Sequence, residues 1–447
     1  MSDAKSSPPA AGLFARALTG SVLTAGSFAL TQALRLGSNL ILTRLLFPEA
    51  FGLMALVSVV LVGLAMFSDV GIGPAISQHP KGDEPEFLDT AFSINVARGA
   101  LLWGLTCVLA WPMAQVYGVP ELMGLLPVAG ISLLISGFNP TRIDTANRHL
   151  LLGRVTLLDL VAQIVGIVAI VVLALLTRSV WALVWGAIIG SAAKLILMHL
   201  LLPGRANRFQ WQPQAGRDLI HFGKWIFLST ACGFLLAQGD KAILGAYLPL
   251  DQLGVYNIGY FLAAFPVLLA GAVTGRIMIP IYRDRPPAAS AENAARLRRL
   301  RFALTGGVLL LLALVGIFAR PLVALLYDAR YLGAAPVIAA LAMAQMPQVI
   351  GMTYDQSALA AGNSRGYFLV MALRAGVQTA AFAMGVHQGG LPGALVGLGL
   401  AGLISHLLII LLARRHRAWD LTHDFVFFLC GSALAAVIFA ANMFDMT

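Results

Sequence analysis

The sequence predicts an all-α protein that crosses a membrane about thirteen times. Two observations support this fold class. Of the 447 residues, 59% are hydrophobic and only 11% are charged, with a mean hydropathy of +0.84, whereas soluble globular proteins carry about 25% charged residues. Apolar stretches of about 20 residues, long enough to span a bilayer, also recur along nearly the whole chain. These observations exclude a water-soluble protein of two or three domains.

The apolar stretches form two groups of six, with one stretch left over. The first group covers 18–45, 51–73, 91–117, 121–141, 155–176 and 179–202. The second covers 218–247, 251–280, 301–327, 333–361, 366–387 and 391–413, and the additional stretch is 423–443. The chain is accordingly predicted to consist of a cytoplasmic tail (1–17), an N-lobe (18–202), a basic cytoplasmic linker (203–217), a C-lobe (218–413), and a final loop and span (414–447). Counts of twelve and fourteen spans stay open.

The distribution of lysine and arginine predicts which side of the membrane each loop faces. Cytoplasmic loops carry an excess of these residues. With the N-terminus placed inside, twenty of the thirty Lys and Arg residues fall in inside segments, four in outside segments and six within spans. This bias predicts a cytoplasmic N-terminus. It also accounts for the net charge of +10 without a nucleic-acid partner.

The two groups of six stretches also resemble each other in sequence. At an offset of 202, the segment around Gly52 superposes on the segment around Gly254. The offset grows to 211 later in the chain, where Asp144 superposes on Asp355. Because each copy has an even number of spans, both copies have the same orientation in the membrane. Parallel repeats of this kind are typical of transporters, with the substrate site between the two halves.

The charged groups within the predicted spans are the candidates for function. A charged side chain at the bilayer centre costs about 2.5–3.5 kcal/mol, so it is expected to face water, a partner or a ligand. The candidates for substrate binding in a cavity are Arg35, Arg98, Lys241, Arg276 and Arg374, and the acids with a coupling or structural role are Asp69, Asp240 and Asp355. A cavity with this excess of bases would suit an anionic substrate such as a phosphate or diphosphate headgroup.

A structural role stays open for several of these residues. Arg98 and Arg276 lie near a cytoplasmic span end, so their charged groups could reach the interface. The acids could instead pair with basic side chains inside the protein. Arg35 and Arg374 lie about ten residues or more from a span end, which favours a water-filled cavity for these two.

Motifs of soluble enzymes are largely missing. The sequence has no HExxH zinc motif and no P-loop. The letters GLGLAG at 397–402 match a dinucleotide fingerprint, but they lie inside an apolar span, where small residues allow close helix packing. We therefore predict no enzyme activity, no cofactor and no metal site. The coupling ion, H+ or Na+, is left open.

Several segments closely resemble polysaccharide transporters, the oligosaccharide flippases of bacterial O-antigen and exopolysaccharide pathways. These segments are 42–78, 179–188, 239–273 and 331–365. This family belongs to a superfamily shared with multidrug and toxin extrusion transporters. The resemblance implies two six-helix lobes around a central cavity. It also implies movement of an undecaprenyl-diphosphate-linked oligosaccharide from the cytoplasmic to the periplasmic leaflet by alternating access.

The resemblance also bears on location, partners and alternatives. It implies a bacterial inner membrane, a lipid-linked oligosaccharide as substrate, and a polysaccharide polymerase and glycosyltransferases as candidate partners. The odd thirteenth span departs from the family pattern, because relatives more often have an even number. Two other functions stay open: a cation-coupled multidrug antiporter, which would favour an acidic cavity, and a non-transporting scaffold of an assembly complex. A membrane polymerase or ligase is disfavoured because no large outer loop is present.

Overall fold

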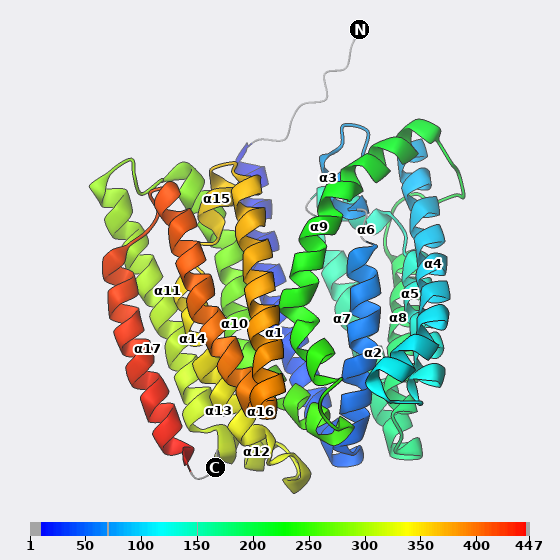
Figure 1. The fold of residues 1–447 in the computed structure, drawn as a ribbon. Coiled ribbons are helices and arrows are strands. Elements are labelled where there is room, and N and C mark those ends of the chain that lie inside the picture. The colour runs from blue at the N-terminus through cyan, green and yellow to red at the C-terminus, as the bar shows by residue number, and fades with distance from the viewer. Residues whose placement is uncertain (1–9, 69–70, 150, 444–447) are drawn as a thin grey trace. The chain divides into compact units, whose positions relative to one another are not determined.

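The computed structural model describes residues 10–68, 71–149 and 151–443, and Figure 1 shows its fold. Every regular element in these residues is a helix. The first half contains α1 (Ala10–Leu45), α2 (Pro48–Phe67), α3 (Ile72–Gln78), α4 (Pro85–Tyr117), α5 (Leu122–Gly137), α6 (Arg142–Arg148), α7 (Leu152–Thr177) and α8 (Trp181–Leu201). The second half contains α9 (Pro213–Leu244), α10 (Leu250–Asp284), α11 (Ala291–Ile317), α12 (Ala319–Leu326), the 3-10 helix η1 (Ala329–Tyr331), α13 (Ala334–Ala344), α14 (Met346–Gly351), α15 (Gln356–Ala360), α16 (Ser364–Arg415) and α17 (Leu421–Ala441). The predicted all-α fold class is confirmed.

The chain forms two compact units. The first unit comprises 1–46 and 60–228, and the second comprises 47–59 and 229–447. In the first unit, α4 packs against α5 and α7 packs against α8. In the second unit, α13 contacts α10, α11 and α16, and most of its small and branched residues are buried. The predicted lobe boundaries at 202 and 218 stay a prediction.

Many helices are long and apolar enough to cross a membrane. Nine helices or helix runs in the described residues meet this criterion, and ten do if the bent pair of α5 and α6 forms one span. Neither α1 nor α9, which contain the predicted first and seventh spans, is among them, and many of their side chains lie outside the described residues. The predicted count of thirteen is therefore not confirmed, although the protein clearly has many spans.

Helix breaks occur where the local sequence disfavours a continuous helix. The chain bends by 58° between α5 and α6, and the break contains Pro140. Proline has no backbone N–H group and so cannot donate a hydrogen bond within a helix. Inside α16, Gly389 and Gly390 leave the helical conformation, and Gly390 has a φ of 57° that favours glycine. These two glycines lie between the predicted spans 366–387 and 391–413. By contrast, the stretch predicted as one span at 301–327 divides into α11 and α12 at Phe318.

The beginnings of α2 and α10 meet in the second unit through a reciprocal backbone contact. A Cβ added at Gly52 would lie 2.0 Å from the carbonyl oxygen of Leu250, and one added at Gly254 would lie 1.9 Å from that of Pro48. Both glycines, and both carbonyl residues, correspond to each other at the offset of 202. The contact therefore joins positions that correspond to each other in the internal repeat inferred from the sequence.

Candidate functional site

A polar cavity of about 170 Å³ lies inside the second unit and is called here the second-unit cavity. Its polar lining comes from α9, α10, α14 and α16, and includes Asp240, Tyr260, Gln348, Arg374, Gln378 and His406. Two of the residues that the sequence selected, Asp240 and Arg374, therefore line the same cavity although 134 positions separate them.

Arg374 and Asp355 form an ion pair at this cavity. The Arg374 guanidinium donates to both carboxylate oxygens of Asp355, at 3.0 and 3.2 Å. Only 8% of the surface of Arg374 is exposed. A buried guanidinium is strongly destabilising without a partner, so the pair accounts for the presence of this charge in an apolar helix. The two residues lie on different elements, and the pair fastens the segment before α15 to α16.

Asp240 is held at the end of α9 with one oxygen bonded and the other not. The Tyr256 hydroxyl donates to its Oδ2 at 2.6 Å. Its Oδ1 is buried and has no hydrogen-bond partner among the described residues. The neighbouring Lys241 places its Nζ 4.8 Å from the centre of the Tyr260 ring, a cation–π contact. Asp240 therefore brings a carboxylate with unused acceptor capacity to the second-unit cavity.

A larger polar cavity of about 420 Å³, the first-unit cavity, lies inside the first unit. Its polar lining consists of Asn95, Arg98, Ser136, Asn139, Asp144 and Lys194. Arg98 donates from its Nε to the Ser68 hydroxyl at 2.9 Å and from its Nη2 to the Ala65 carbonyl at 2.7 Å. The last carbonyls of a helix lack partners within that helix, so Arg98 also caps the end of α2.

The first-unit cavity includes residues that were not predicted as site residues. Lys194 forms an ion pair with Asp159 at 2.7 Å. The Asn139 Oδ1 is buried without a hydrogen-bond partner among the described residues. Asn95 and Asn139 were not among the predicted site residues because those were chosen by charge, and side-chain amides are neutral. A search for all polar side chains within apolar spans would have found them.

The remaining predicted site residues are placed less completely. Arg35 lies on α1 as an exposed residue, and its guanidinium donates to the Gln32 side chain at 3.4 Å. The backbone of Arg276 lies in α10, but its side chain is outside the described residues, and so is the whole of Asp69. The structure therefore brings together Asp240, Arg374 and Asp355, places Arg98 at another cavity, and leaves the roles of the others as predictions.

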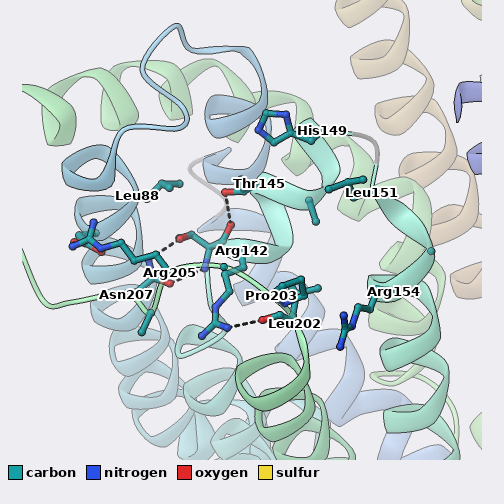
Figure 2. A pocket seen from close by; sticks show the side chains of 16 residues that line it. Leu88, Arg142, Thr145, His149, Leu151, Arg154, Leu202, Pro203, Arg205 and Asn207 are labelled. Carbon is teal, nitrogen blue, oxygen red and sulfur yellow. Dashed lines mark hydrogen bonds and ion pairs between the residues drawn. The ribbon is translucent and has the colours of Figure 1, made fainter. Parts of the chain in front are cut away.

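A third cavity, of about 540 Å³, lies at one end of the first unit (Figure 2). It is called here the linker cavity, because the segment 202–207 between α8 and α9 forms one of its walls. Three arginines from three different segments line it: Arg142 of α6, Arg154 of α7 and Arg205 of the linker. All three lie in segments that the charge distribution predicts to be cytoplasmic.

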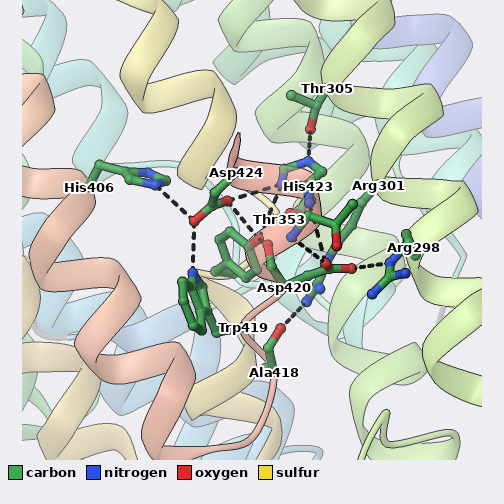
Figure 3. Close-up of polar contacts among 12 residues, drawn as sticks. Arg298, Arg301, Thr305, Thr353, His406, Ala418, Trp419, Asp420, His423 and Asp424 are labelled. Atoms are coloured by element: carbon green, nitrogen blue, oxygen red, sulfur yellow. Dashed lines mark hydrogen bonds and ion pairs between the residues drawn. The ribbon is translucent and has the colours of Figure 1, made fainter. Parts of the chain in front are cut away.

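A buried polar network surrounds the beginning of α17 (Figure 3). The carboxylate of Asp424 lies within hydrogen-bond distance of four side chains: Tyr354 Oη at 2.8 Å, Trp419 Nε1 at 2.8 Å, His423 Nδ1 at 3.1 Å and His406 Nε2 at 3.2 Å. His406 also lines the second-unit cavity. This network was not predicted from the sequence, although the adjacent His423 and Asp424 near the start of an apolar span were a detectable signal.

Asp420 caps α17 and connects it to α11. Its side chain accepts the backbone N–H groups of Thr422 and His423, and its Oδ2 lies 2.6 Å from Arg298 Nε. Burial acts to raise the pKa of Asp420, but the hydrogen bonds from Arg298 and from the His423 backbone together bring that pKa below its ordinary value. The loop before α17 therefore carries an ionised carboxylate at neutral pH.

The polar side chains at these sites are suited to binding polar ligands. Within the described ranges, no group of three or more His, Cys, Asp or Glu side chains is arranged to hold a metal ion. The two unit cavities offer amides, hydroxyls and a few charges, which can hydrogen-bond polar ligands.

Comparison with known sequences gives consistent relatives. Residues 41–336 match the family described as polysaccharide biosynthesis protein. The succinoglycan biosynthesis transport protein ExoT of Rhizobium meliloti (strain 1021) is 25% identical over 374 residues, covering 82% of this chain and 73% of that protein. The teichuronic acid biosynthesis protein TuaB of Bacillus subtilis (strain 168) is 22% identical over 288 residues, covering 63% of this chain and 58% of that protein.

Comparison with solved structures identifies the fold. The lipid II flippase MurJ in an inward closed conformation has a TM-score of 0.68 at 12% identity, covering 95% of this chain and 98% of that chain. An inward-facing multidrug resistance MATE transporter of the MOP superfamily has a TM-score of 0.66 at 16% identity, covering 87% of this chain and 95% of that chain. At these identities the likeness establishes the fold alone, and it confirms the fold family that the sequence predicted.

Proposed function

Because the chain belongs to the polysaccharide biosynthesis protein family, we propose that it is a flippase for an undecaprenyl-diphosphate-linked oligosaccharide. In this proposal it moves the substrate from the cytoplasmic to the periplasmic leaflet of a bacterial inner membrane, by alternating access. The family and the fold are those of membrane transporters. The identity of the cargo, the direction of movement and the mechanism are the proposed part.

One observation carries the proposal: a polysaccharide biosynthesis chain has the fold of a protein named as a lipid II flippase. A glycan has many hydroxyl groups, and transfer of each unpaired hydroxyl into hydrocarbon costs several kcal/mol. An oligosaccharide therefore needs a polar path across the membrane, whereas its polyprenyl tail can stay in lipid. The polar side chains that this chain keeps inside its apolar helices are consistent with such a path.

The cavity residues suit the two chemical parts of this cargo. Side-chain amides both donate and accept hydrogen bonds, as sugar hydroxyls do, and Asn95, Asn139 and Gln378 line the cavities. A diphosphate requires cations, and the candidates that we propose for its binding are Arg35, Arg98, Lys241, Arg276 and Arg374. Among these residues, Arg374 also has a structural role, because it forms an ion pair with Asp355.

Asp240 is our candidate for the coupling acid. Its Oδ1 is buried without a partner at the second-unit cavity, so a proton or a cation could bind there and leave without breaking the bond from Tyr256. Asp69 and Asp355 are retained as further acids with a coupling or structural role. Binding of a proton or a cation at Asp240 would shift the equilibrium between the conformation open to one leaflet and the conformation open to the other.

A complementation experiment tests the proposal. A strain that lacks this protein should lose its surface polysaccharide and accumulate the lipid-linked precursor, and the wild-type gene should restore both. Asp240→Asn and Arg98→Ala should each lower the rate of polysaccharide export by about tenfold or more, the effect of about 1.4 kcal/mol.

The control variant is Arg285→Gln, because Arg285 is exposed after α10 and lies outside the three cavities described above. It should export polysaccharide as the wild type does. Normal polysaccharide without the protein would refute the proposed function. Full export by a variant carrying both Arg98→Ala and Asp240→Asn would refute the assignment of these two residues.

A further inference from the structure

The linker cavity has an assembled wall. The Thr141 backbone N–H donates to Asn207 Oδ1 at 3.0 Å, and Asn207 Nδ2 donates to Thr141 Oγ1 at 2.7 Å. Gly204 has a φ of 137°, and a Cβ there would lie 3.0 Å from Cδ of Arg142. This φ and this close approach to the side chain of Arg142 both favour glycine at position 204. These contacts fix the linker against α6 and hold the cavity open between them.

The charge of the linker cavity is positive and not balanced from within. Arg205 is neutralised by Asp89, with Nη2 and Oδ2 2.9 Å apart. Arg142 donates to the Leu202 carbonyl at 2.5 Å, and its buried Nε has no hydrogen-bond partner among the described residues. Neither Arg142 nor Arg154 pairs with an acidic side chain in the part of the chain that the structure describes. Two guanidinium groups therefore contribute uncompensated charge to one cavity (Figure 2).

The rest of the lining is largely apolar, with Leu88, Ala146, Leu151 and Pro203 among its members. Leu151 is 60% exposed, and Leu200, just before the linker, is 76% exposed. Exposed leucines at helix ends are expected where a protein meets lipid. The cavity thus combines cationic groups with apolar walls at the level where the membrane helices end.

We propose that the linker cavity binds a phosphate-bearing anion, and that this phosphate belongs to the headgroup of an anionic lipid. Guanidinium groups bind phosphate through charge-assisted hydrogen bonds, and Arg142 and Arg154 both belong to the lining of this cavity. Basic pockets between membrane helices on the cytoplasmic side bind anionic headgroups in other proteins. The apolar walls favour a lipid over free phosphate, which has no apolar part to bury. This inference does not depend on the proposed transport activity.

Lipid titration of the full-length protein tests this assignment. The purified protein is delipidated in detergent and titrated separately with phosphatidylglycerol, phosphatidylcholine and inorganic phosphate, and binding is followed by native mass spectrometry. The informative variant is Arg154→Gln, because Arg154 makes no hydrogen bond or ion pair with the described residues and its loss should leave the fold intact. The matched control is Arg285→Gln, an exposed arginine outside the cavity.

Phosphatidylglycerol should bind more tightly than phosphatidylcholine. Arg154→Gln should weaken phosphatidylglycerol binding by about fivefold, which corresponds to about 1 kcal/mol for one basic residue near the membrane surface. Arg154→Lys should retain most of the affinity, and Arg285→Gln should retain all of it. Binding of inorganic phosphate that equals that of the lipid and depends on Arg154 would support the phosphate site but assign it to a free anion.

Two results would overturn the proposal. Equal losses of phosphatidylglycerol affinity in Arg154→Gln and Arg285→Gln would show that lipid binding depends only on the total positive charge of the protein surface. Unchanged affinity in Arg154→Gln would show that the cavity does not hold the phosphate. Thermal unfolding of each variant, measured on the same preparation, shows whether its fold is intact.

Discussion

Two regions of the molecule, the paired groups around α16 and α17 and the linker cavity, differ in how their charged groups are balanced. In the second unit, acids and bases meet: Arg374 binds Asp355, and Asp424 lies against His406 and His423. At the linker cavity of the first unit, Arg142 and Arg154 have no acidic partner among the described residues.

This difference separates two reasons for keeping a charge in a membrane protein. A charge that is paired inside the protein can connect helices, and removal of one partner leaves the other buried and unpaired. A charge at a cavity that has no acidic partner, such as that of the exposed Arg154, is left to interact with water or with a ligand. We therefore assign the paired groups of the second unit mainly to structure and the two unpaired arginines to ligand binding.

The largest effect is expected from the loss of Asp424. Asp424→Ala removes the carboxylate that four side chains of the network share. It should lower the free energy of unfolding by about 3–5 kcal/mol, as the loss of one partner in a buried ionic network does. Thermal unfolding in detergent measures this loss. Asp284→Ala is the control, since Asp284 pairs with Arg283 at an exposed position and should matter little. If Asp424→Ala unfolded with the same free energy as the wild type, the network would not be needed for stability.

A smaller effect is expected at the close contact between α2 and α10 in the second unit. Gly254→Ala would place a Cβ 1.9 Å from the Pro48 carbonyl oxygen, so α2 and α10 must separate. Such overpacking costs about 1–3 kcal/mol. Gly271→Ala, in the same helix but with no atom within 4 Å of the new Cβ, should be neutral or slightly stabilising. Equal melting temperatures for the two variants would show that the close contact is not required.

The ion pair of the second unit can be tested by a double-mutant cycle. Arg374→Ala and Asp355→Ala should each destabilise the protein, and the double variant should lose less than the sum of the two. The expected coupling is about 1–2 kcal/mol, within the range for residues in direct contact. Strictly additive losses would mean that the pair contributes nothing, and Arg374 would then belong with the unpaired arginines.

The smallest predicted effect is a pH dependence at the cap of α17. The pKa of Asp420 is lower in the folded protein than its ordinary value, because the hydrogen bonds from Arg298 and the His423 N–H outweigh burial. Its stabilising contribution is therefore complete above about pH 4, the usual pKa of an unfolded Asp, and is lost as the pH falls through the folded pKa. The melting temperature should fall more steeply below about pH 4 in the wild type than in Asp420→Asn. Parallel curves would contradict this assignment.

The sequence predicted the helices better than their interruptions. The predicted span 251–280 lies within α10, and the two glycines that break α16 fall between two predicted spans. The division at Phe318 was missed, because an apolar stretch has the same hydropathy whether it forms one continuous helix or two. Helix breaks depend on tertiary packing as well as on local sequence.

The candidate site was predicted in part for a similar reason. The free-energy cost of burying a charged side chain was enough to identify Asp240 and Arg374 as site candidates. The structure places both residues at one cavity. Cost of burial does not reveal a partner, so the bond between Arg374 and Asp355 could not be predicted. The network around Asp424 was missed because Tyr354 comes from the turn between α14 and α15 and His406 from α16, and only the fold brings them to the start of α17.

Reconstituted transport tests the central proposal most directly. The purified protein is placed in vesicles that carry an undecaprenyl-diphosphate-linked oligosaccharide in one leaflet only, and the appearance of the glycan in the other leaflet is measured. We expect transfer to be fast with the wild-type protein, slow with Asp240→Asn, and absent from protein-free vesicles. Transfer no faster with the wild-type protein than in protein-free vesicles, in a preparation that still binds the glycan lipid, would contradict the assignment as a flippase.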